Sequence, residues 1–169
     1  SQKIIIDTDP GIDDTMAIFF ALNSPEIDVL GLTTVYGNTS TDQGTINALR
    51  ILEIALRADI PVYAGADKPI ESEYTGKGEF VHGHDGQGNT NLKAPSIKAA
   101  TGSAVDFLEK TIRENPGEVI LVPIGPLTNI AELLIKNPEI AKDIKEIILM
   151  GGNALSQGNA SPSAEANIR

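Results

Sequence analysis

The sequence predicts an α/β fold, an open and mostly parallel β-sheet with helices on both faces. Short runs of aliphatic and β-branched residues alternate with longer segments of helical periodicity, which is typical of parallel strands joined by crossover helices. The short runs are apolar at nearly every position, so the strands are expected to be buried on both sides. Glycine, proline and asparagine separate the segments, where turns are expected.

The first part of the chain is expected to hold three strands and two helices. In order, they are a strand at Lys3–Asp7, a helix through Met16–Leu22, a strand at Ile27–Val35, a helix at Asp42–Leu56 and a strand at Pro61–Ala64. Asp13 or Asp14 begins the first helix, and Met16–Leu22 is apolar almost all round, so this helix is expected to be buried. The second helix carries an apolar stripe that ends at Leu56.

The second part of the chain continues the alternation. The expected elements are a helix capped by Ser103 with its apolar stripe at Val105, Leu108 and Ile112, a strand at Glu118–Ile124, a helix at Thr128–Ile135, a short turn begun by Asn137 and Pro138, and a strand at Lys145–Met150. Gly151–Arg169 has no periodicity and nothing to cover a sheet edge. We therefore expect an incomplete domain.

Composition excludes several classes of protein. The 169 residues are 41% hydrophobic and 21% charged, which is typical of one globular domain and excludes a disordered chain or a coiled coil. The net charge of −10 argues against nucleic-acid or anionic-membrane partners. The chain has no cysteine, which excludes disulfides and thiolate nucleophiles. No secretory signal or membrane span is visible, so a cytoplasmic location is expected.

Four carboxylates lie within eight residues where the first strand meets the first helix: Asp7, Asp9, Asp13 and Asp14. Ligands of open α/β sheets bind at the carboxyl ends of strands, where this turn lies. Carboxylates this close repel one another unless a positive charge lies between them. Asp9 and Asp14 are therefore candidate ligands of one cation, and an all-oxygen ligand set favours calcium or magnesium.

Structural roles compete with metal binding at this turn. Asp13 or Asp14 can cap the helix, and Asp7 can hold the turn. An EF-hand loop counted from Asp7 does not fit, because its fifth and sixth positions hold Gly11 and Ile12. A haloacid-dehalogenase-type phosphatase also begins with a strand and Asp-x-Asp. It stays as an alternative, although that family has Thr or Val where this chain has Gly11.

Polar residues also follow the later strands. Asn38 follows the second strand, and proline and glycine in Val122–Asn129 expose main-chain carbonyls, which are good calcium ligands. Asn159, Glu165 and Asn167 follow the fifth strand, and their amides and carboxylate suit hydrogen bonds to vicinal hydroxyls. Each of these residues is also compatible with an ordinary polar position in a turn or loop.

The long segment Asp67–Ser96 has little periodicity, which favours a functional loop or flap. It contains both histidines of the chain, His82 and His84. These two histidines could bind a metal together. Alternatively, they could face the solvent or the edge of a substrate. No nucleophile elbow is present, so Ser-His-Asp catalysis is not supported.

Six groups of residues together resemble the N-terminal half of the inosine-uridine preferring nucleoside hydrolase family. They occur in the family's order and span nearly the whole chain: Ile4–Asp14, Thr33–Asn38, Val81–Gly83, Gly125–Asn129, Met150–Gly152 and Gly158–Asn167. The acidic group is highly specific. Residues 1–169 are therefore expected to be the N-terminal portion of a single Rossmann-like domain whose C-terminal half is absent.

The resemblance implies an N-ribohydrolase of purine or pyrimidine salvage, which cleaves the N-glycosidic bond of ribonucleosides to give ribose and free base. It implies calcium held by Asp9, Asp14 and the main-chain oxygen of Ile124, with Asp9 also the general base for a calcium-bound water. The residues implied to contact the nucleoside are Asp13 at the ribose 2′-hydroxyl, His82 near the base, Met150 in the pocket lining, and Asn38, Asn159, Glu165 and Asn167 around ribose.

The chain departs from the family in one residue and in length. Ala166 stands where the family has Phe. The family's second half, which supplies a further Asp ligand and in several members a His that protonates the base, lies outside these residues. We therefore expect weak calcium binding and poor turnover from this chain alone, with the missing half and a homo-oligomer, dimer or tetramer, as partners. A non-catalytic, calcium-dependent nucleoside- or ribose-binding fragment is the alternative.

Overall fold

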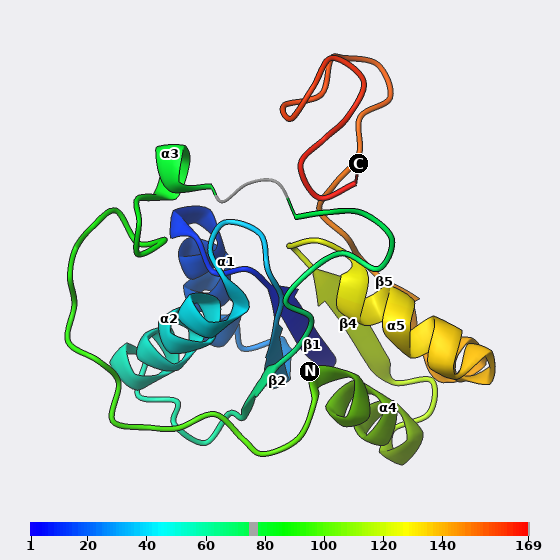
Figure 1. The fold of residues 1–169 in the computed structure, drawn as a ribbon. Helices are drawn as coiled ribbons and strands as arrows, with labels where there is room; N and C mark the ends of the chain where they lie inside the picture. The colour runs from blue at the N-terminus through cyan, green and yellow to red at the C-terminus, as the bar shows by residue number, and fades with distance from the viewer. Residues whose placement is uncertain (75–77, 169) are drawn as a thin grey trace.

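The computed structural model describes residues 1–74 and 78–168. Its sheet has five strands: β1 (Gln2–Thr8), β2 (Ile27–Thr34), β3 (Val62–Ala64), β4 (Val119–Pro123) and β5 (Glu146–Ile147). They lie in the order β3-β2-β1-β4-β5, and every neighbouring pair is parallel (Figure 1). The predicted parallel sheet is confirmed.

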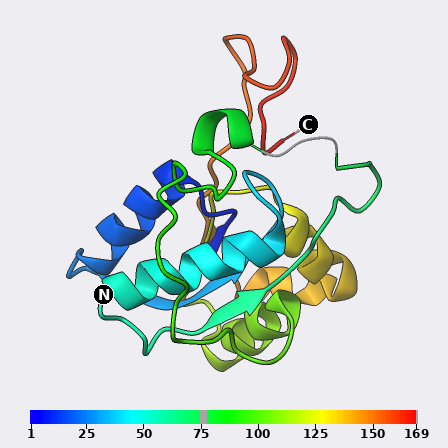
Figure 2. The same cartoon turned by 60° about the vertical axis from the view of Figure 1, so that its left-hand side comes forward.

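Helices cover both faces of this sheet, as predicted (Figure 2). They are α1 (Ile12–Leu22), α2 (Thr41–Ile54), α3 (Glu79–His82), α4 (Ala104–Glu114), α5 (Thr128–Lys136) and the 3₁₀ helix η1 (Pro138–Asp143). Successive residues of β1 point to opposite faces, so Ile4 and Ile6 join the core under α1 and α2. Ile5 joins a second core, with Leu108 of α4 and Leu133 of α5.

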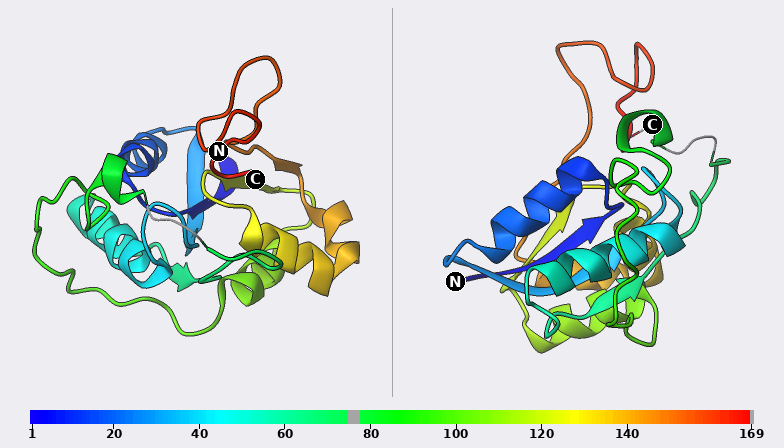
Figure 3. Two further views of the ribbon diagram at one scale, coloured as in Figure 1. Left: turned by 45° about the horizontal axis from the view of Figure 1, so that its top comes forward. Right: turned by 90° about the vertical axis from the view of Figure 1, so that its left-hand side faces the viewer.

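The order of the strands places a topological switch point at the centre of the sheet. From β1 the chain proceeds outward to β2 and β3, then returns to pair β4 with the other side of β1. The connections after β1 and β4 therefore leave on opposite faces and open a crevice at their carboxyl ends, where open α/β sheets bind ligands. Helix α3 and the segment after β5 lie at this same end of the molecule (Figure 3).

Three predicted elements differ from the structure. The first helix is not buried all round: Met16 and Phe20 are 71% and 73% exposed, because only one side of α1 packs on the sheet. The second helix ends before Leu56, which lies in the turn with a φ of 57°. The fifth strand is only Glu146–Ile147, although the Ile148 and Met150 amides still donate to carbonyls of β4.

One face of the sheet is partly uncovered. On the side of α1 and α2, an apolar groove of about 320 Å³ runs between α1 and the β4–β5 edge. Phe20 and Ala17 of α1 line one side of it, and Ile120, Val122 and Ile148 line the other. Apart from α1, the groove is lined by residues of β1, β2 and β4 and by Ile124 and Ile148, which follow β4 and β5. No described helix has the length and apolar character needed to cross a membrane.

Candidate functional site

The acidic turn joins β1 to α1 at the switch point. Gly11, and neither Asp13 nor Asp14, is the N-cap of α1. Asp14 is nevertheless part of the cap, because its carboxylate accepts from the Gly11 amide at 3.2 Å. Its other oxygen accepts from the Thr8 hydroxyl at 2.6 Å. The helix start thus fixes the Asp14 carboxylate in the crevice.

Asn38, in the loop after β2, connects Asp9 with Asp14. The Asn38 amide donates to Asp9 Oδ2 at 2.7 Å. The Asn38 side-chain nitrogen donates to the Asp9 carbonyl and to Asp14 Oδ2, both at 3.2 Å. Three residues that the sequence singled out on two strand ends are therefore in direct contact.

Two glycines allow the Asp9 carboxylate to enter this space. A Cβ at Gly37 would lie 1.9 Å from Asp9 Oδ2, and a Cβ at Gly125 would lie 2.7 Å from Asp9 Oδ1. Any larger residue at Gly37 or Gly125 would displace the carboxylate. The backbone turns after β2 and β4 therefore form a cradle around it.

The Asp9 and Asp14 carboxylates form a buried pair whose pKa values are both raised. Asp9 is 3% exposed and Asp14 4% exposed. Burial, and then the charge of Asp14, raises the pKa of Asp9 to about 9. Burial also raises the pKa of Asp14, and the nearby charge of Asp13 adds to this. No described residue places a positive charge beside these two carboxylates. A bound cation would favour their ionised forms and would therefore lower both pKa values.

The donor set fits a hard cation in part. Two carboxylates and the nearby carbonyl of Ile124 are oxygen ligands of the kind that calcium prefers. In the part of the chain that the structure describes, no group of three or more acidic, histidine or cysteine residues is arranged to hold a metal ion. Further oxygens from water, substrate or additional polypeptide are therefore needed to complete a coordination shell of six to eight ligands.

Beneath Asp9, a largely buried network joins three strand ends. The Asn129 side chain donates to Asp7 Oδ1 at 2.7 Å and to the Thr34 carbonyl at 3.0 Å, and it accepts from the Ala66 amide at 2.9 Å. The Thr33 hydroxyl also donates to Asp7 Oδ1. Burial raises the pKa of Asp7 to about 7. Asp7 therefore supports the floor of the site.

The C-terminal segment brings Asn167 against the loop after β4. The Asn167 side chain donates to the carbonyls of Ile124 and Met150, each at 3.1 Å. Glu165 Oε2 accepts from the amides of Gly152, Asn167 and Ile168. Its other oxygen, Oε1, is buried without a hydrogen-bond partner among the described residues, as is Asp7 Oδ2.

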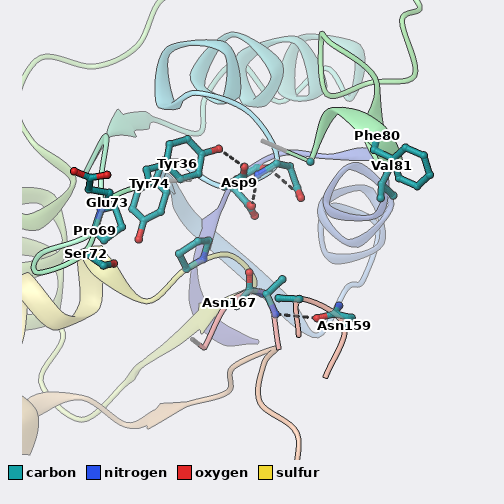
Figure 4. Close-up of a pocket in the computed structure, with 16 residues that line it drawn as sticks. Asp9, Tyr36, Pro69, Ser72, Glu73, Tyr74, Phe80, Val81, Asn159 and Asn167 are labelled. Atoms are coloured by element: carbon teal, nitrogen blue, oxygen red, sulfur yellow. Dashed lines mark hydrogen bonds between the residues drawn. The ribbon is translucent and has the colours of Figure 1, made fainter. Parts of the chain in front are cut away.

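A pocket of about 360 Å³ lies above the acidic turn (Figure 4). Of the residues expected to contact substrate or metal, Asp9, Asn38, Asn159 and Asn167 line it. Asp14, Ile124 and Met150 contact these lining residues. Asp14 accepts a hydrogen bond from Asn38, and the carbonyls of Ile124 and Met150 accept from Asn167. The fold thus brings predicted residues from four separate segments together at one site.

Asp13, His82 and Glu165 do not line the pocket, although His82 directly follows the lining residue Val81. His82 Nδ1 accepts from the Ile12 amide at 3.2 Å and lies 3.7 Å from an Asp13 carboxylate oxygen. His82 is buried and lies in α3, within the segment expected to be an irregular loop. His84 is exposed and pairs with Glu79 instead, so the two histidines do not form a metal pair.

The pocket's aromatic and apolar walls were not predicted from the sequence. Tyr36 and Tyr74 pack edge to face with ring centroids 4.9 Å apart on one wall, and Phe80 and Val81 lie on the opposite wall (Figure 4). The Tyr36 hydroxyl is hydrogen-bonded to the hydroxyl of Thr128, at the start of α5. A tyrosine directly after a strand end was the available signal for Tyr36. The others lie in the long loop, whose path no local pattern reveals.

Known proteins resemble this chain in both sequence and structure. The profile of the inosine-uridine preferring nucleoside hydrolase family matches residues 4–169. Uridine nucleosidase 1 of Arabidopsis thaliana is 47% identical over 99% of this chain and 50% of its own length. A plant nucleoside hydrolase structure is 49% identical, with a TM-score of 0.95 over 98% of this chain and 52% of that chain.

Similarity extends to a bacterial structure. The purine-preferring ribonucleoside hydrolase of Gardnerella vaginalis is 38% identical, with a TM-score of 0.94 over 98% of this chain and 54% of that chain. The chain spans about half the length of the curated relatives it matches. A profile match over nearly every residue and a shared fold lead to one conclusion: the chain belongs to the inosine-uridine preferring nucleoside hydrolase family.

Proposed function

We propose that the chain is the N-terminal half of an N-ribohydrolase that cleaves ribonucleosides into ribose and free base. The single observation that carries this is the pocket at the switch point, where Asp9, Asn38, Asn159 and Asn167 converge. Its lower wall offers carboxylate and amide groups suited to a sugar, and its side walls offer aromatic surface suited to a planar base. Because the chain matches the nucleoside hydrolase family, we do not propose the phosphatase alternative.

Calcium is the proposed cofactor. Asp9, Asp14 and the carbonyl of Ile124 would hold it. The buried, mutually repelling carboxylates supply the reason, because they have no cation beside them among the described residues. When bound, calcium would orient the ribose hydroxyls and make an attacking water more acidic.

The proposed ribose contacts follow from the free hydrogen-bonding groups. Glu165 Oε1 has no partner among the described residues and would accept from a ribose hydroxyl. Asn38, Asn159 and Asn167 would hold the other hydroxyls, with Met150 in the lining. Asp13 would bind the 2′-hydroxyl, and His82, whose Nδ1 lies 3.7 Å from an Asp13 carboxylate oxygen, would face the base.

Asp9 is the proposed general base. It would accept a proton from the water that attacks C1′, while the C1′–N bond breaks and its electron pair leaves with the base. The carboxylates around the sugar would stabilise the positive charge that develops on ribose. General base catalysis of this kind contributes roughly 10²–10⁴-fold to the rate.

The proposed partners are a small-molecule nucleoside and further polypeptide. A second half like that of the relatives would cover the apolar groove between α1 and the β4–β5 edge and supply the acid for the leaving base. The uncovered isoleucine, valine and phenylalanine side chains support this, because burying them against another apolar surface is favourable. Assembly as a dimer or tetramer and a cytoplasmic location complete the proposal.

Release of ribose from uridine and inosine tests the proposed function. With calcium present, a reducing-sugar assay should detect ribose from the wild-type protein. Asp9→Asn should lower the rate by at least roughly 10²-fold, because the general base is lost. Asp42→Asn, an exposed aspartate in the first turn of α2, is the matched control and should leave the rate unchanged.

Binding separates the enzyme from its rival. The chain spans about half of its relatives, which favours a second candidate, a non-catalytic nucleoside- or ribose-binding fragment. Calcium-dependent uridine binding by calorimetry without any ribose would establish that candidate for this chain. Absence of both binding and product would defeat both.

A further inference from the structure

Arg50, in the middle of α2, holds a long loop against the helix. Its side chain is almost fully buried. The guanidinium donates to the carbonyls of Leu92 and Lys93, each at 3.1 Å, and to the side-chain oxygen of Gln87 at 2.7 Å. These neutral oxygens all belong to residues 87–93. A buried guanidinium is costly unless its donors are satisfied, so this loop and the arginine require each other.

Asn47, one turn earlier on α2, joins the same loop to the acidic turn. It is fully buried. Its side-chain nitrogen donates to the Pro10 carbonyl at 3.1 Å and to the Asp85 carbonyl at 2.8 Å. Its oxygen accepts from Arg50 at 3.3 Å. Both amide hydrogens are therefore used to connect the turn that carries Asp9 with the loop that follows His82.

The loop between these anchors is itself compact. The Asp85 carboxylate accepts from the amides of Gln87, Asn89 and Asn91. The Gly88 amide donates back to the His82 carbonyl at 2.7 Å. His82 Nδ1 in turn accepts from the Ile12 amide at the start of α1. Hydrogen bonds and the short backbone of the loop thus lead from Arg50 to the main-chain carbonyl of His82, whose side chain contacts the start of α1.

We infer that Asn47 and Arg50 are positioning residues that hold His82 over the start of α1 and thereby set nucleoside affinity. This rests on the proposed function for its link to affinity, but the positioning itself does not. Without the two anchors, the loop of residues 83–93 would leave α2, and the imidazole would lose its fixed place beside Asp13.

The imidazole signals of the chain test the positioning directly. His82 and His84 are the only histidines, so an ¹⁵N-edited NMR spectrum contains two ring systems, one buried and one exposed. In the wild type, His82 Nδ1 should show the shift of a hydrogen-bond acceptor. Arg50→Met keeps the aliphatic bulk but removes the donors. It should move the His82 signals toward those of His84 and speed amide exchange at Gly88.

Two further variants keep the test decisive. Arg113→Met removes an exposed arginine of α4 and should change neither signal. Gln87→Leu removes one loop-side partner of Arg50 without altering α2, and should shift His82 in the same direction even where Arg50→Met does not fold. An unchanged His82 environment in a folded Arg50→Met or Gln87→Leu protein would overturn the inference.

A measurement of uridine affinity is the second test of the inference. The Kd for uridine, measured by calorimetry with calcium, should rise roughly three- to tenfold in Arg50→Met, following the fraction of molecules whose loop stays docked. Arg50→Lys, which retains the charge and some donors, should recover part of this. An unchanged Kd despite a released His82 would overturn the link to affinity. A wild type that does not bind uridine would count against the proposed function, while the NMR result would still decide the positioning.

Discussion

The Asp14 carboxylate has a structural role and also lies at the proposed metal site. Asp14 closes the N-terminus of α1 through Gly11 and also faces Asp9 across the crevice. The capping interpretation and the metal interpretation of the sequence were therefore not exclusive. A short aspartate can do both because the positive end of the helix dipole and a bound cation both favour its ionised form.

Calcium should stabilise the chain through this pair. At a calcium concentration of 100 times Kd, binding contributes about 2.7 kcal/mol, and for a chain of this size each kcal/mol raises Tm by roughly 2–4 °C. Asp9→Asn should remove most of this gain. In chelator the same variant should be at least as stable as the wild type, because it no longer buries an ionisable group. Differential scanning fluorimetry would show both effects, and equal calcium responses in the two proteins would contradict the site.

Asp7 should make the metal-free chain less stable as pH rises. Burial raises its folded-state pKa from 3.8 to about 7, so the folded state binds the proton more tightly than the unfolded state. Stability from this group is complete below about pH 4 and is lost as pH rises through about 7. Urea unfolding in chelator at pH 5 and 8 should show a smaller loss in Asp7→Asn than in the wild type. Parallel pH profiles would exclude Asp7 as a source of this dependence.

At the scale of secondary structure, helix ends were predicted well where one side chain determines them. Ser103 was expected to cap the third long helix, and its hydroxyl accepts from the Asp106 amide at 3.1 Å. Pro138 begins η1, as its fixed φ suggests. The predicted end of α2 was wrong. The apolar stripe continues to Leu56, but the backbone already turns at that residue. Periodicity indicates a buried face but does not mark where a helix ends.

Removing the Ser103 cap should destabilise the chain modestly. Ser103→Ala loses the hydrogen bond to the Asp106 amide and should lower the free energy of unfolding by about 1 kcal/mol. Ser103→Gly should cost only a few tenths of a kcal/mol, because glycine leaves the amide open to water. Urea unfolding would measure both. Equal losses in the two variants would show that the hydroxyl bond is not the source.

At the scale of the whole molecule, the sheet has one well-covered face and one that is half open. The core beneath α4 and α5 is closed, whereas the groove beside α1 exposes Phe20 and Ile148 to solvent. This distribution explains why the first helix, although apolar almost all round, is not buried in the chain. Its outer residues suit contact with additional polypeptide.

The open groove should bind hydrophobic dyes in the native chain. Phe20→Glu places a charge at its edge and should lower native-state ANS fluorescence without lowering the free energy of unfolding much, since Phe20 is largely exposed already. Leu155→Glu makes the same change at an exposed leucine outside the groove and should have little effect. Equal effects of the two substitutions would show that the groove is not the binding surface.

Local sequence was sufficient for the parallel sheet, most strands and the residues at the strand ends. Local patterns predict local structure: an apolar run indicates a strand and a glycine indicates a turn. Parallel strands then bring their carboxyl ends, and the carboxylates that follow them, together at one edge of the sheet. That is why Asp9 and Asn38 could be expected to face the same crevice. Asn167 does not lie at a strand end, and only the resemblance to the family indicated that it joins them. The acidic cluster also indicated a cation site before any contact was visible.

Tertiary structure alone decided what covers each surface and where the long loop runs. Burial of α1 depends on which partners pack against it, and no residue in its own segment encodes their presence. Likewise, Asn47 and Arg50 read as ordinary helical residues until residues 85–93 lie against them. Such contacts join segments about 40 residues apart, so only the folded chain reveals them.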